Sequence, residues 1–253
     1  MFRKKEFSEK TIFLAGASGV IGYPLAKMLV EAGYPVFGTT RLTTKVDRLI
    51  GIGVKPVVVD VFDVDTLEQA IMAIQPEIVI HQLTDLPDGL PADKMPEALV
   101  RNARIRDEGT RNLVRAAEKA NAKKFIAQSI AFVYAPSNQP HTEESPLLDF
   151  NDPVYGQTAQ AVYSLEQQVL NGKFDTAIIL RNGWLYGADS GYKAPVEFAP
   201  SLHVNAAVFA AFLAVKSDKS GVYNVADQDK RLDTSKFCST FPEWDARFSL
   251  PIK

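Results

Sequence analysis

Short apolar segments alternate with longer amphipathic ones along most of this chain. The short segments are continuously hydrophobic, which is typical of strands in a parallel sheet covered on both faces. The first of these segments ends at Gly16. The later ones are Pro35–Thr39, Pro56–Asp60, Glu77–His81, Lys124–Gln128, Thr176–Leu180 and Gly221–Val225. Between them the predicted helices are Val20–Ala32, Val46–Ile50, Thr66–Ile74, Pro96–Ala120, Gln157–Leu170 and Asn205–Val215. Strand–helix–strand order with right-handed crossovers predicts an α/β fold with a doubly wound parallel sheet.

Three glycines follow the first predicted strand. Gly16, Gly19 and Gly22 have the spacing G-x-x-G-x-x-G and lead into a predicted helix. Glycine has no Cβ, so the backbone of such a turn can approach a phosphate closely. The helix after it directs free N–H groups and the positive end of its dipole at an anion. A tight turn without ligand is the alternative, but the strand before and the helix after favour a phosphate-bearing cofactor.

Length and charge limit the class of protein. The chain has 253 residues, of which 46% are hydrophobic, and this size suits one large domain with at most a small appendage. Its net charge is −2, without a long run of one sign, so we expect neither nucleic acid nor an anionic membrane as a partner. The uncharged stretch Thr11–Ala26 is shorter than the roughly 20 residues that a membrane span needs.

Cysteine and histidine usage adds two expectations. Cys238 is the only cysteine, so no intramolecular disulfide can form. The three histidines lie far apart and show no metal-ligand spacing, so we expect no metal site. The N-terminal segment Met1–Lys10 is charged and lacks the apolar region of a signal peptide. We therefore expect a cytoplasmic protein of a reducing compartment.

Further motifs lie at the ends of the predicted strands and in the long helix. They are Gly16–Gly22, Asp60-Val61, Gly109–Leu113, Phe125–Tyr134, Leu180–Gly187 and Leu202–Ala207. Together they resemble the extended short-chain dehydrogenase/reductase family, the NAD-dependent epimerase/dehydratases. The resemblance implies a Rossmann domain for a nicotinamide dinucleotide, formed by residues 10–181 and 202–226. It also implies small substrate-covering segments, residues 182–201 and 227–253, a small-molecule substrate, and subunit pairing in a homodimer through two of the helices.

The end of the second strand indicates which cofactor binds. An acid there binds the adenosine ribose 2′-OH and repels a 2′-phosphate. Here the chain reads Thr39-Thr40-Arg41, and no acid lies between Glu31 and Asp47. Because Arg41 can pair with a 2′-phosphate, we expect NADP(H) rather than NAD(H). Arg41 as a solvated loop residue is the alternative.

The resemblance also implies which residues surround the cofactor. Asp60 and Val61 would flank the adenine, and the residues after the fourth strand would line the far side. The whole predicted set is Gly16, Ser18, Gly19, Val20, Ile21, Gly22, Thr40, Arg41, Asp60, Val61, Gln82, Leu83 and Thr84. His81, at the end of the fourth strand, fits equally well as a residue without a ligand role.

Relatives of this type transfer hydride to or from a carbon that bears oxygen. They use a Tyr, a Lys four residues later and a Ser or Thr from the fifth strand, and the Lys lowers the pKa of the Tyr from the same helix face. Here Tyr155 stands at the Tyr position, but Ala159 and Ile130 replace the other two. We expect Tyr155 and Ser129, the neighbour of Ile130, to be catalytic. A small insertion would make Tyr163 a rival of Tyr155.

The missing Lys favours one reaction direction. A free tyrosine, with a pKa of about 10, is roughly 0.1% ionised near neutral pH, so it is a poor base but a usable acid. We therefore expect an oxidoreductase or epimerase of this family type that favours NADPH-linked reduction of a nucleotide-sugar-like or other small carbonyl substrate. A catalytically silent NADP(H)-binding sensor or interaction protein is the alternative. By the resemblance, the substrate contacts would be Arg106, where the family usually has Asn, together with Trp184 and Tyr186, although all three also fit structural roles.

Overall fold

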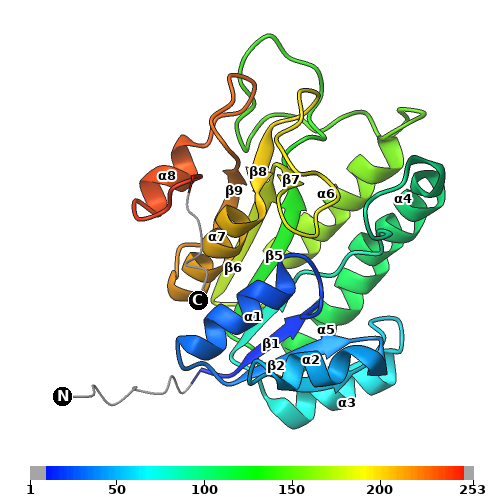
Figure 1. Ribbon diagram of the computed structural model, residues 1–253, viewed down its shortest axis with the longest axis vertical. Helices are drawn as coiled ribbons and strands as arrows, with labels where there is room; N and C mark the ends of the chain where they lie inside the picture. Colours follow the sequence, from blue (N-terminus) through cyan, green and yellow to red (C-terminus); the bar gives the residue numbers. More distant parts are fainter. Residues whose placement is uncertain (1–9, 248–253) are drawn as a thin grey trace.

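The computed structural model describes residues 10–247 (Figure 1). Residues 1–9, which form most of the charged N-terminal segment, lie outside the described residues. So do residues 248–253, the end of the second predicted substrate-covering segment.

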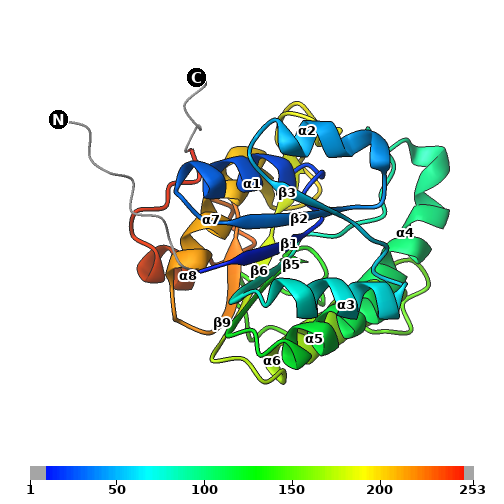
Figure 2. The same cartoon turned by 90° about the horizontal axis from the view of Figure 1, so that it is seen from below.

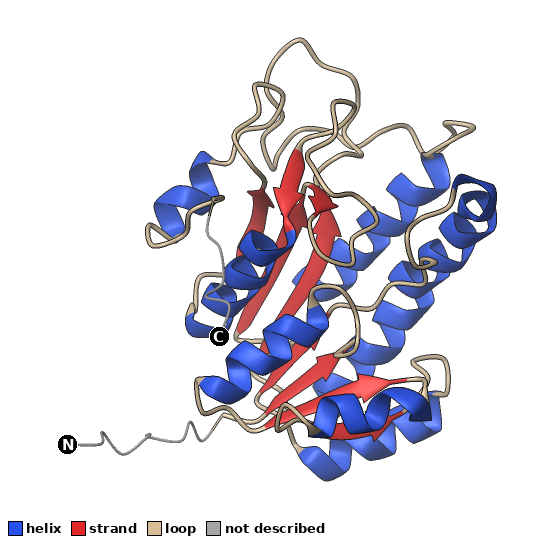
Figure 3. Ribbon diagram, viewed as in Figure 1, coloured by secondary structure: helices blue, strands red, loops and turns tan. Residues whose placement is uncertain are grey.

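Seven strands form one parallel sheet in the order β3-β2-β1-β4-β5-β6-β9. They are β1 (Ile12–Ala15), β2 (Val36–Thr40), β3 (Lys55–Val58), β4 (Ile78–His81), β5 (Lys124–Ile130), β6 (Thr176–Asn182) and β9 (Gly221–Val225). The doubly wound Rossmann-like fold predicted from the sequence is confirmed. The strand order reverses between β1 and β4, and in such sheets ligands bind at the carboxyl ends of the strands beside this point. Figure 3 shows that β5, β6 and β9 end among loops at the top of the molecule.

Helices cover both faces of the sheet (Figure 2). One face carries α1 (Gly22–Glu31), α2 (Val46–Ile50), α7 (Val204–Lys216) and α8 (Ser235–Thr240), and the other carries α3 (Val64–Ile74), α5 (Thr110–Lys119) and α6 (Gly156–Leu170). Side chains of a strand point alternately to its two faces. Ile12 and Leu14 accordingly join the core beneath α1 and α7, whereas Phe13 joins the core beneath α3 and α5.

The long helix predicted over Pro96–Ala120 forms with an interruption. The helix α4 (Met95–Arg104) and the helix α5 are joined by a π-helical turn, Ile105–Gly109. Such a turn holds one extra residue and is frequent at functional sites. Arg106 lies in this turn.

The two predicted substrate-covering segments differ in the structure. The first contains β7 (Trp184–Tyr186) and ends at the first residue of β8 (Ser201–His203), the strand with which β7 pairs. Both strands are too short to leave a pattern in the sequence. The described part of the second forms α8 and adds Phe237, Phe241 and Trp244 to the core beside β9. It therefore mainly completes the sheet face next to α7.

Two further expectations concern the outer surface. None of the described helices is both long and apolar enough to cross a bilayer. Val100 on α4 and Tyr163 on α6 are about half exposed, at 53% and 48%. Pairing of subunits through these two helices stays a prediction.

Candidate active site

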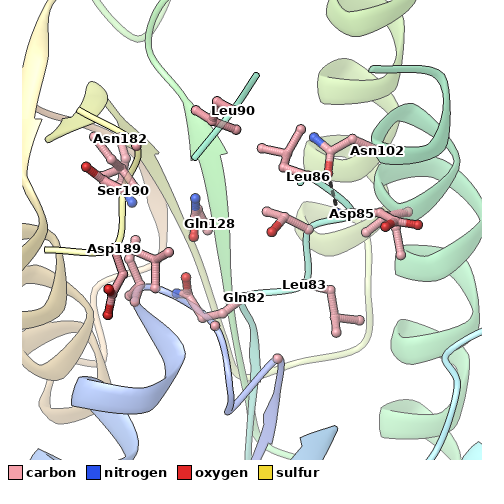
Figure 4. A pocket seen from close by; sticks show the side chains of 18 of the residues that line it. Gln82, Leu83, Asp85, Leu86, Leu90, Asn102, Gln128, Asn182, Asp189 and Ser190 are labelled. Carbon is pink, nitrogen blue, oxygen red and sulfur yellow. Dashed lines mark hydrogen bonds between the residues drawn. The ribbon is translucent and has the colours of Figure 1, made fainter. Parts of the chain in front are cut away.

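A cavity of about 1450 Å³ opens at the carboxyl ends of the strands on both sides of the switch point. Its volume exceeds the about 300–1000 Å³ of a typical small-ligand pocket, so it has room for a dinucleotide and a substrate together. Figure 4 shows part of its wall, where Gln82, Gln128 and Asn182 project from the ends of β4, β5 and β6. The substrate-covering segment 182–201 also contributes, whereas no described residue after Asn205 lines the cavity.

The glycine turn forms one end of this cavity. Gly16 has a φ of +86°, and a Cβ there would lie 2.7 Å from the carbonyl oxygen of Gln82. A Cβ on Gly22 would collide with the carbonyl oxygen of Gly16, although Gly22 itself does not line the cavity. A Cβ on Gly19 would meet only that same oxygen, at an ordinary 3.4 Å. Folding thus requires Gly16 and Gly22, whereas Gly19 leaves space for a ligand.

The start of α1 is open toward the cavity. Ile21 is the N-cap residue and supplies no side-chain hydrogen bond to the first turn of the helix. In this first turn the N–H groups of Tyr23 and Leu25 donate to the carbonyl oxygens of Gly19 and Ile21, both at 3.0 Å, and Pro24 has no N–H. An anion would therefore meet the N–H of Gly22 and those of the glycine turn before it. The lining residues of this end are Gly16, Ser18, Gly19, Val20 and Ile21.

Arg41 lines the cavity at the end of β2. Its Nη2 lies 3.4 Å from Oδ1 of Asp85, which follows β4. Nε of Arg101 lies 3.7 Å from the other carboxylate oxygen. The Arg41 side chain is 46% exposed, and pairs this exposed contribute only about 0–1 kcal/mol. Arg41 can therefore exchange Asp85 for another anion, and Thr40 lines the cavity beside it.

The ends of β3 and β4 supply most of the residues predicted there. Val61, Gln82, Leu83 and Thr84 line the cavity. Asp60 does not, because its side chain is exposed and Oδ1 accepts the N–H of Phe62 at 3.0 Å. Gln82 is buried, and its Oε1 has no hydrogen-bond partner among the described residues. Buried amide oxygens are usually paired, so this one fits a donor group of a bound cofactor.

His81 lies behind this wall with both ring nitrogens in use. Nδ1 accepts the N–H of Leu83 at 3.2 Å, so Nε2 carries the proton and donates to the Thr110 hydroxyl at 3.0 Å. Burial, and secondarily the charge of Arg106, lowers the pKa of His81 to about 4. The neutral ring fixes the backbone at the end of β4. This geometry supports the strand-end role rather than contact with a ligand.

Tyr155 precedes α6 and lines the cavity, with about half of its surface exposed. The two positions that hold its catalytic partners in relatives are apolar here. Ile130 and Ala159 are buried in one hydrophobic cluster with Val133 and Val162. Ile130 and Val133 of this cluster line the cavity, whereas Ala159 does not, and neither partner position carries a charge.

The alternative tyrosine lies elsewhere. Tyr163 packs against Phe150, with ring centroids 5.6 Å apart, and does not line the main cavity. Of the two candidate tyrosines, the structure brings Tyr155 alone to the predicted cofactor residues.

Ser129 points away from the cavity. Gln128 and Ile130 line it, and because side chains alternate along β5, Ser129 between them faces the other side of the sheet. Its hydroxyl donates to Oε1 of Glu166 at 2.7 Å. This placement separates Ser129 from Tyr155 and from the space that a substrate would fill.

Ser129 belongs to a buried polar network that the sequence pattern did not reveal. Arg181 donates to both carboxylate oxygens of Glu166, at 2.8 and 2.6 Å, and to the Tyr134 hydroxyl at 2.8 Å. Tyr134 in turn donates to Oδ1 of Asn224 at 2.6 Å. Burial opposes the charge of Arg181, but the hydrogen bonds to Glu166 raise its pKa above the ordinary value. The available signal was a charged residue within an apolar strand, since such residues are almost never buried unpaired.

The predicted substrate residues separate into two groups. Arg106 and Trp184 line the cavity, and Trp184 packs against Phe198 with ring centroids 4.9 Å apart. Tyr186 does not line it and packs edge-on against His203. Burial and a hydrogen bond to Asp227 raise the pKa of Tyr186 to about 12.

A parallel sheet with a glycine turn at its switch point and an open helix N-terminus defines a dinucleotide-binding protein of the Rossmann type. The chain belongs to the NAD dependent epimerase/dehydratase family, which it matches over residues 12–226. Members of this family are NAD(P)-dependent oxidoreductases and epimerases. The unpartnered Gln82 oxygen and the open glycine turn fit such a cofactor.

Two named proteins are similar in sequence. A 3-diazoavenalumate denitrifying reductase from a Streptomyces species is 37% identical, over 86% of this chain and 76% of that protein. A putative NADPH-dependent methylglyoxal reductase from Candida albicans is 50% identical, but over only 17% of this chain and 12% of that protein.

Solved structures share the fold at lower identity. UDP-glucose 4-epimerase from Thermotoga maritima, solved with UDP-glucose, has a TM-score of 0.74 at 19% identity and covers 94% of each chain. The Bordetella bronchiseptica enzyme WbmG, in complex with NAD and UDP, has a TM-score of 0.74 at 19% identity. That match covers 96% of this chain and 92% of WbmG.

Proposed function

We propose that this protein is an NADPH-dependent reductase of a small carbonyl compound, with Tyr155 as the proton donor. The observation that carries the proposal is the position of Tyr155 at the cavity, with the apolar residues Ile130 and Ala159 at the two positions of its usual partners. Alcohol oxidation needs a base, and a phenol becomes one near neutral pH only when a neighbouring cation lowers its pKa. Carbonyl reduction needs an acid, and a neutral phenol meets that need. The name of the Streptomyces relative, a reductase, supports the same direction.

In this proposal the chain's own residues bind, orient and supply a proton. When bound, reduced nicotinamide supplies the hydride. The glycine turn and the open N-terminus of α1 hold the phosphates, and Gln82 accepts a hydrogen bond from the cofactor. Tyr155 donates its hydroxyl proton to the carbonyl oxygen, which becomes the alcohol, and the phenolate left on Tyr155 takes a proton from solvent, to which about half of the residue is exposed.

Arg41 is the basis for proposing NADPH rather than NADH. It lines the cavity at the end of β2, where no carboxylate would repel a 2′-phosphate, and its present partner Asp85 holds it weakly. The test measures the dissociation constants of NADPH and NADH by fluorescence titration. Arg41→Ala should weaken the binding of NADPH by about tenfold or more and leave the affinity for NADH nearly unchanged, because charge-assisted hydrogen bonds contribute about 1.5–3 kcal/mol. Equal binding of both cofactors by the wild-type protein would refute the NADPH preference.

The test of the reaction follows NADPH consumption with a panel of small aldehydes and ketones. Tyr155→Phe should lower turnover by about 100-fold or more while NADPH binding is retained, as expected for loss of a general acid. Tyr163→Phe is the matched control, because it removes the same hydroxyl from α6, two turns beyond Tyr155 and outside the cavity, and should retain full turnover. A Tyr155→Phe variant as active as the wild type would exclude Tyr155 as the acid.

A second candidate function follows from the same apolar wall. The Streptomyces relative is named as a denitrifying reductase of a diazo compound. Replacing the N₂ group of an aryl diazonium ion by hydride releases N₂ and needs no proton donor, so it would tolerate Ile130 and Ala159. This function predicts NADPH consumption with an aryl diazonium salt that Tyr155→Phe does not slow. If neither substrate class causes NADPH consumption although NADPH binds tightly, the protein is the catalytically silent sensor or interaction protein instead.

A further inference from the structure

Arg106 is an arginine that faces the cavity from inside the fold. It lies in the π-helical turn between α4 and α5, next to the buried His81 and toward Glu166 of α6. Burial lowers the pKa of Arg106 to about 10, which still leaves the guanidinium charged near neutral pH. The turn therefore places a positive charge at the depth where β4 and β5 end.

The charge of Arg106 lacks a direct partner among the described residues, although the carboxylate of Glu166 acts on it from a distance. Arg106 makes no hydrogen bond or ion pair with any of the residues 10–247. The carboxylate of Glu166 is occupied by Arg181 and Ser129, and the ring of His81 is neutral. Other arginines of the same helical segment, Arg104 and Arg111, do have acidic partners four residues away. Arg106 is partly exposed at the cavity wall, and a charge held there without a paired counter-ion points to an anion that arrives with a ligand.

The cofactor already has other sites for its negative charges. Its phosphates are accounted for by the glycine turn at one end of the cavity. The remaining cations that line the cavity within the described residues are Arg41, Lys45 and Arg48, which all belong to the segment after β2. Arg106 is thus separated in sequence and in strand position from the cations that serve the adenosine end.

The surroundings of Arg106 limit what else the ligand carries. The same cavity is lined by Leu86, Leu90, Phe132 and Trp184, which suit an apolar body. Besides Asp85, which pairs with Arg41, the carboxylates of Asp88 and Asp189 line the cavity and disfavour a ligand with several negative charges. Among the described lining residues, a nucleoside diphosphate sugar would find one cation, Arg106, outside the cofactor end. A planar monoanion matches the fork of a guanidinium with two parallel hydrogen bonds.

We propose that Arg106 binds the carboxylate of the substrate, and that the substrate is a carbonyl compound with an apolar body and a single carboxylate. This inference rests on the proposed function only in taking the cavity as the substrate site. It selects, from the nucleotide-sugar-like and small carbonyl substrates that the sequence suggests, a small carboxylic acid.

The test compares 4-acetylbenzoate with its methyl ester, which has the same ketone and ring but no charge. Binding to the protein saturated with oxidised cofactor, NADP⁺ or NAD⁺, is measured by calorimetry, so no turnover is needed. The wild-type protein should bind the acid at least tenfold more tightly than the ester. Arg106→Met should abolish that preference, because it weakens the binding of the acid and leaves the affinity for the ester unchanged.

Arg111→Met is the matched control. It removes the same charge from the next turn of the helix, but Arg111 is exposed, pairs with Asp107 at 2.8 Å and does not line the cavity. This variant should bind the acid as the wild-type protein does. Arg106→Lys keeps the charge without the fork, so it should bind the acid with intermediate affinity.

Three results would overturn the inference: no binding of the acid by the wild-type protein, equal binding of acid and ester, or an unchanged affinity for the acid in Arg106→Met. If Arg106→Met does not fold, the acid–ester comparison in the wild-type protein and Arg106→Lys decides. Failure of the proposed function is distinguishable. Acid-selective binding without NADPH consumption would refute the proposed reductase function and support the carboxylate site. NADPH consumption without a preference for the acid over the ester would refute the carboxylate site and support the reductase function.

Discussion

His81 connects a residue at the cavity wall with the stability of the whole chain. Its ring is buried, accepts the N–H of Leu83 and donates to Thr110, and it can do both only while neutral. The pKa of His81 is about 4 in the folded protein, against about 6.5 in an unfolded chain. Between these two values the unfolded chain binds a proton that the folded protein refuses.

The free energy of unfolding should therefore fall as the pH falls from about 6.5 to about 4. The contribution of His81 is fully present above about pH 6.5 and amounts to about 3 kcal/mol, of which about 2 kcal/mol is lost on going from pH 7 to pH 5. Urea denaturation at several pH values measures it. His81→Gln, which cannot titrate, should show a flatter profile over this range, while His141, whose pKa burial also lowers, contributes equally to both proteins. Parallel profiles would contradict the assignment.

At the scale of elements, the hydrophobic pattern could predict which segments form strands and helices but not every direction within them. The seven strands and the glycine turn are expected from the sequence because continuous apolar runs and unusual glycines are local signals. The direction of Ser129 is not local, since it depends on the register of β5 against β4 and β6. Asp60 likewise precedes a lining residue, Val61, without lining the cavity itself.

The π-helical turn shows the same limit. Residues Pro96–Ala120 have a helical period throughout, so the sequence predicts one helix there. Arg106 lies within the π-helical turn and lines the cavity, and neither fact follows from the helical period. The strands β7 and β8 are three residues each, which is too short for any period to show.

Two glycines in the turn between β1 and α1 should have different roles, Gly19 in binding the cofactor and Gly22 in folding. Gly19→Ala should change the free energy of unfolding by less than about 1 kcal/mol, because its Cβ would meet only an ordinary contact. The same change should weaken the binding of NADPH by about tenfold or more, because the added methyl group would keep the phosphates from approaching the backbone of the turn. Fluorescence titration and urea denaturation measure the two effects.

Gly22→Ala is the counterpart, because its Cβ would collide with the backbone of Gly16. It should destabilise the protein by about 1–3 kcal/mol, as overpacking does. A Gly19→Ala variant that binds NADPH normally would show that the phosphates do not approach this turn.

For the molecule as a whole, the buried network of Ser129, Glu166 and Arg181 connects the loop before Tyr155 to the second half of the sheet. Glu166 lies on α6, Arg181 on β6 and Ser129 on β5. Arg181 also donates to the carbonyl oxygen of Glu143, in the loop that leads toward Tyr155, at 3.0 Å. The same loop also contacts β9, because the N–H of Asn224 donates to the carboxylate of Glu143 at 2.7 Å. One ion pair thus joins two strands, a helix and the loop before the proposed proton donor.

Removing one side of this pair should be more damaging than removing both. Glu166→Gln leaves a buried, charged Arg181 without its counter-ion and should lower the free energy of unfolding by about 3–5 kcal/mol. In Glu166→Gln combined with Arg181→Met, the unpaired charge is gone, so part of that loss should be recovered. Glu108→Gln is the control, since its pair with Arg104 is exposed and should contribute less than about 1 kcal/mol. Urea denaturation measures all three, and a double variant less stable than Glu166→Gln alone would mean that the hydrogen bonds of Arg181, rather than its neutralisation, hold this part of the molecule together.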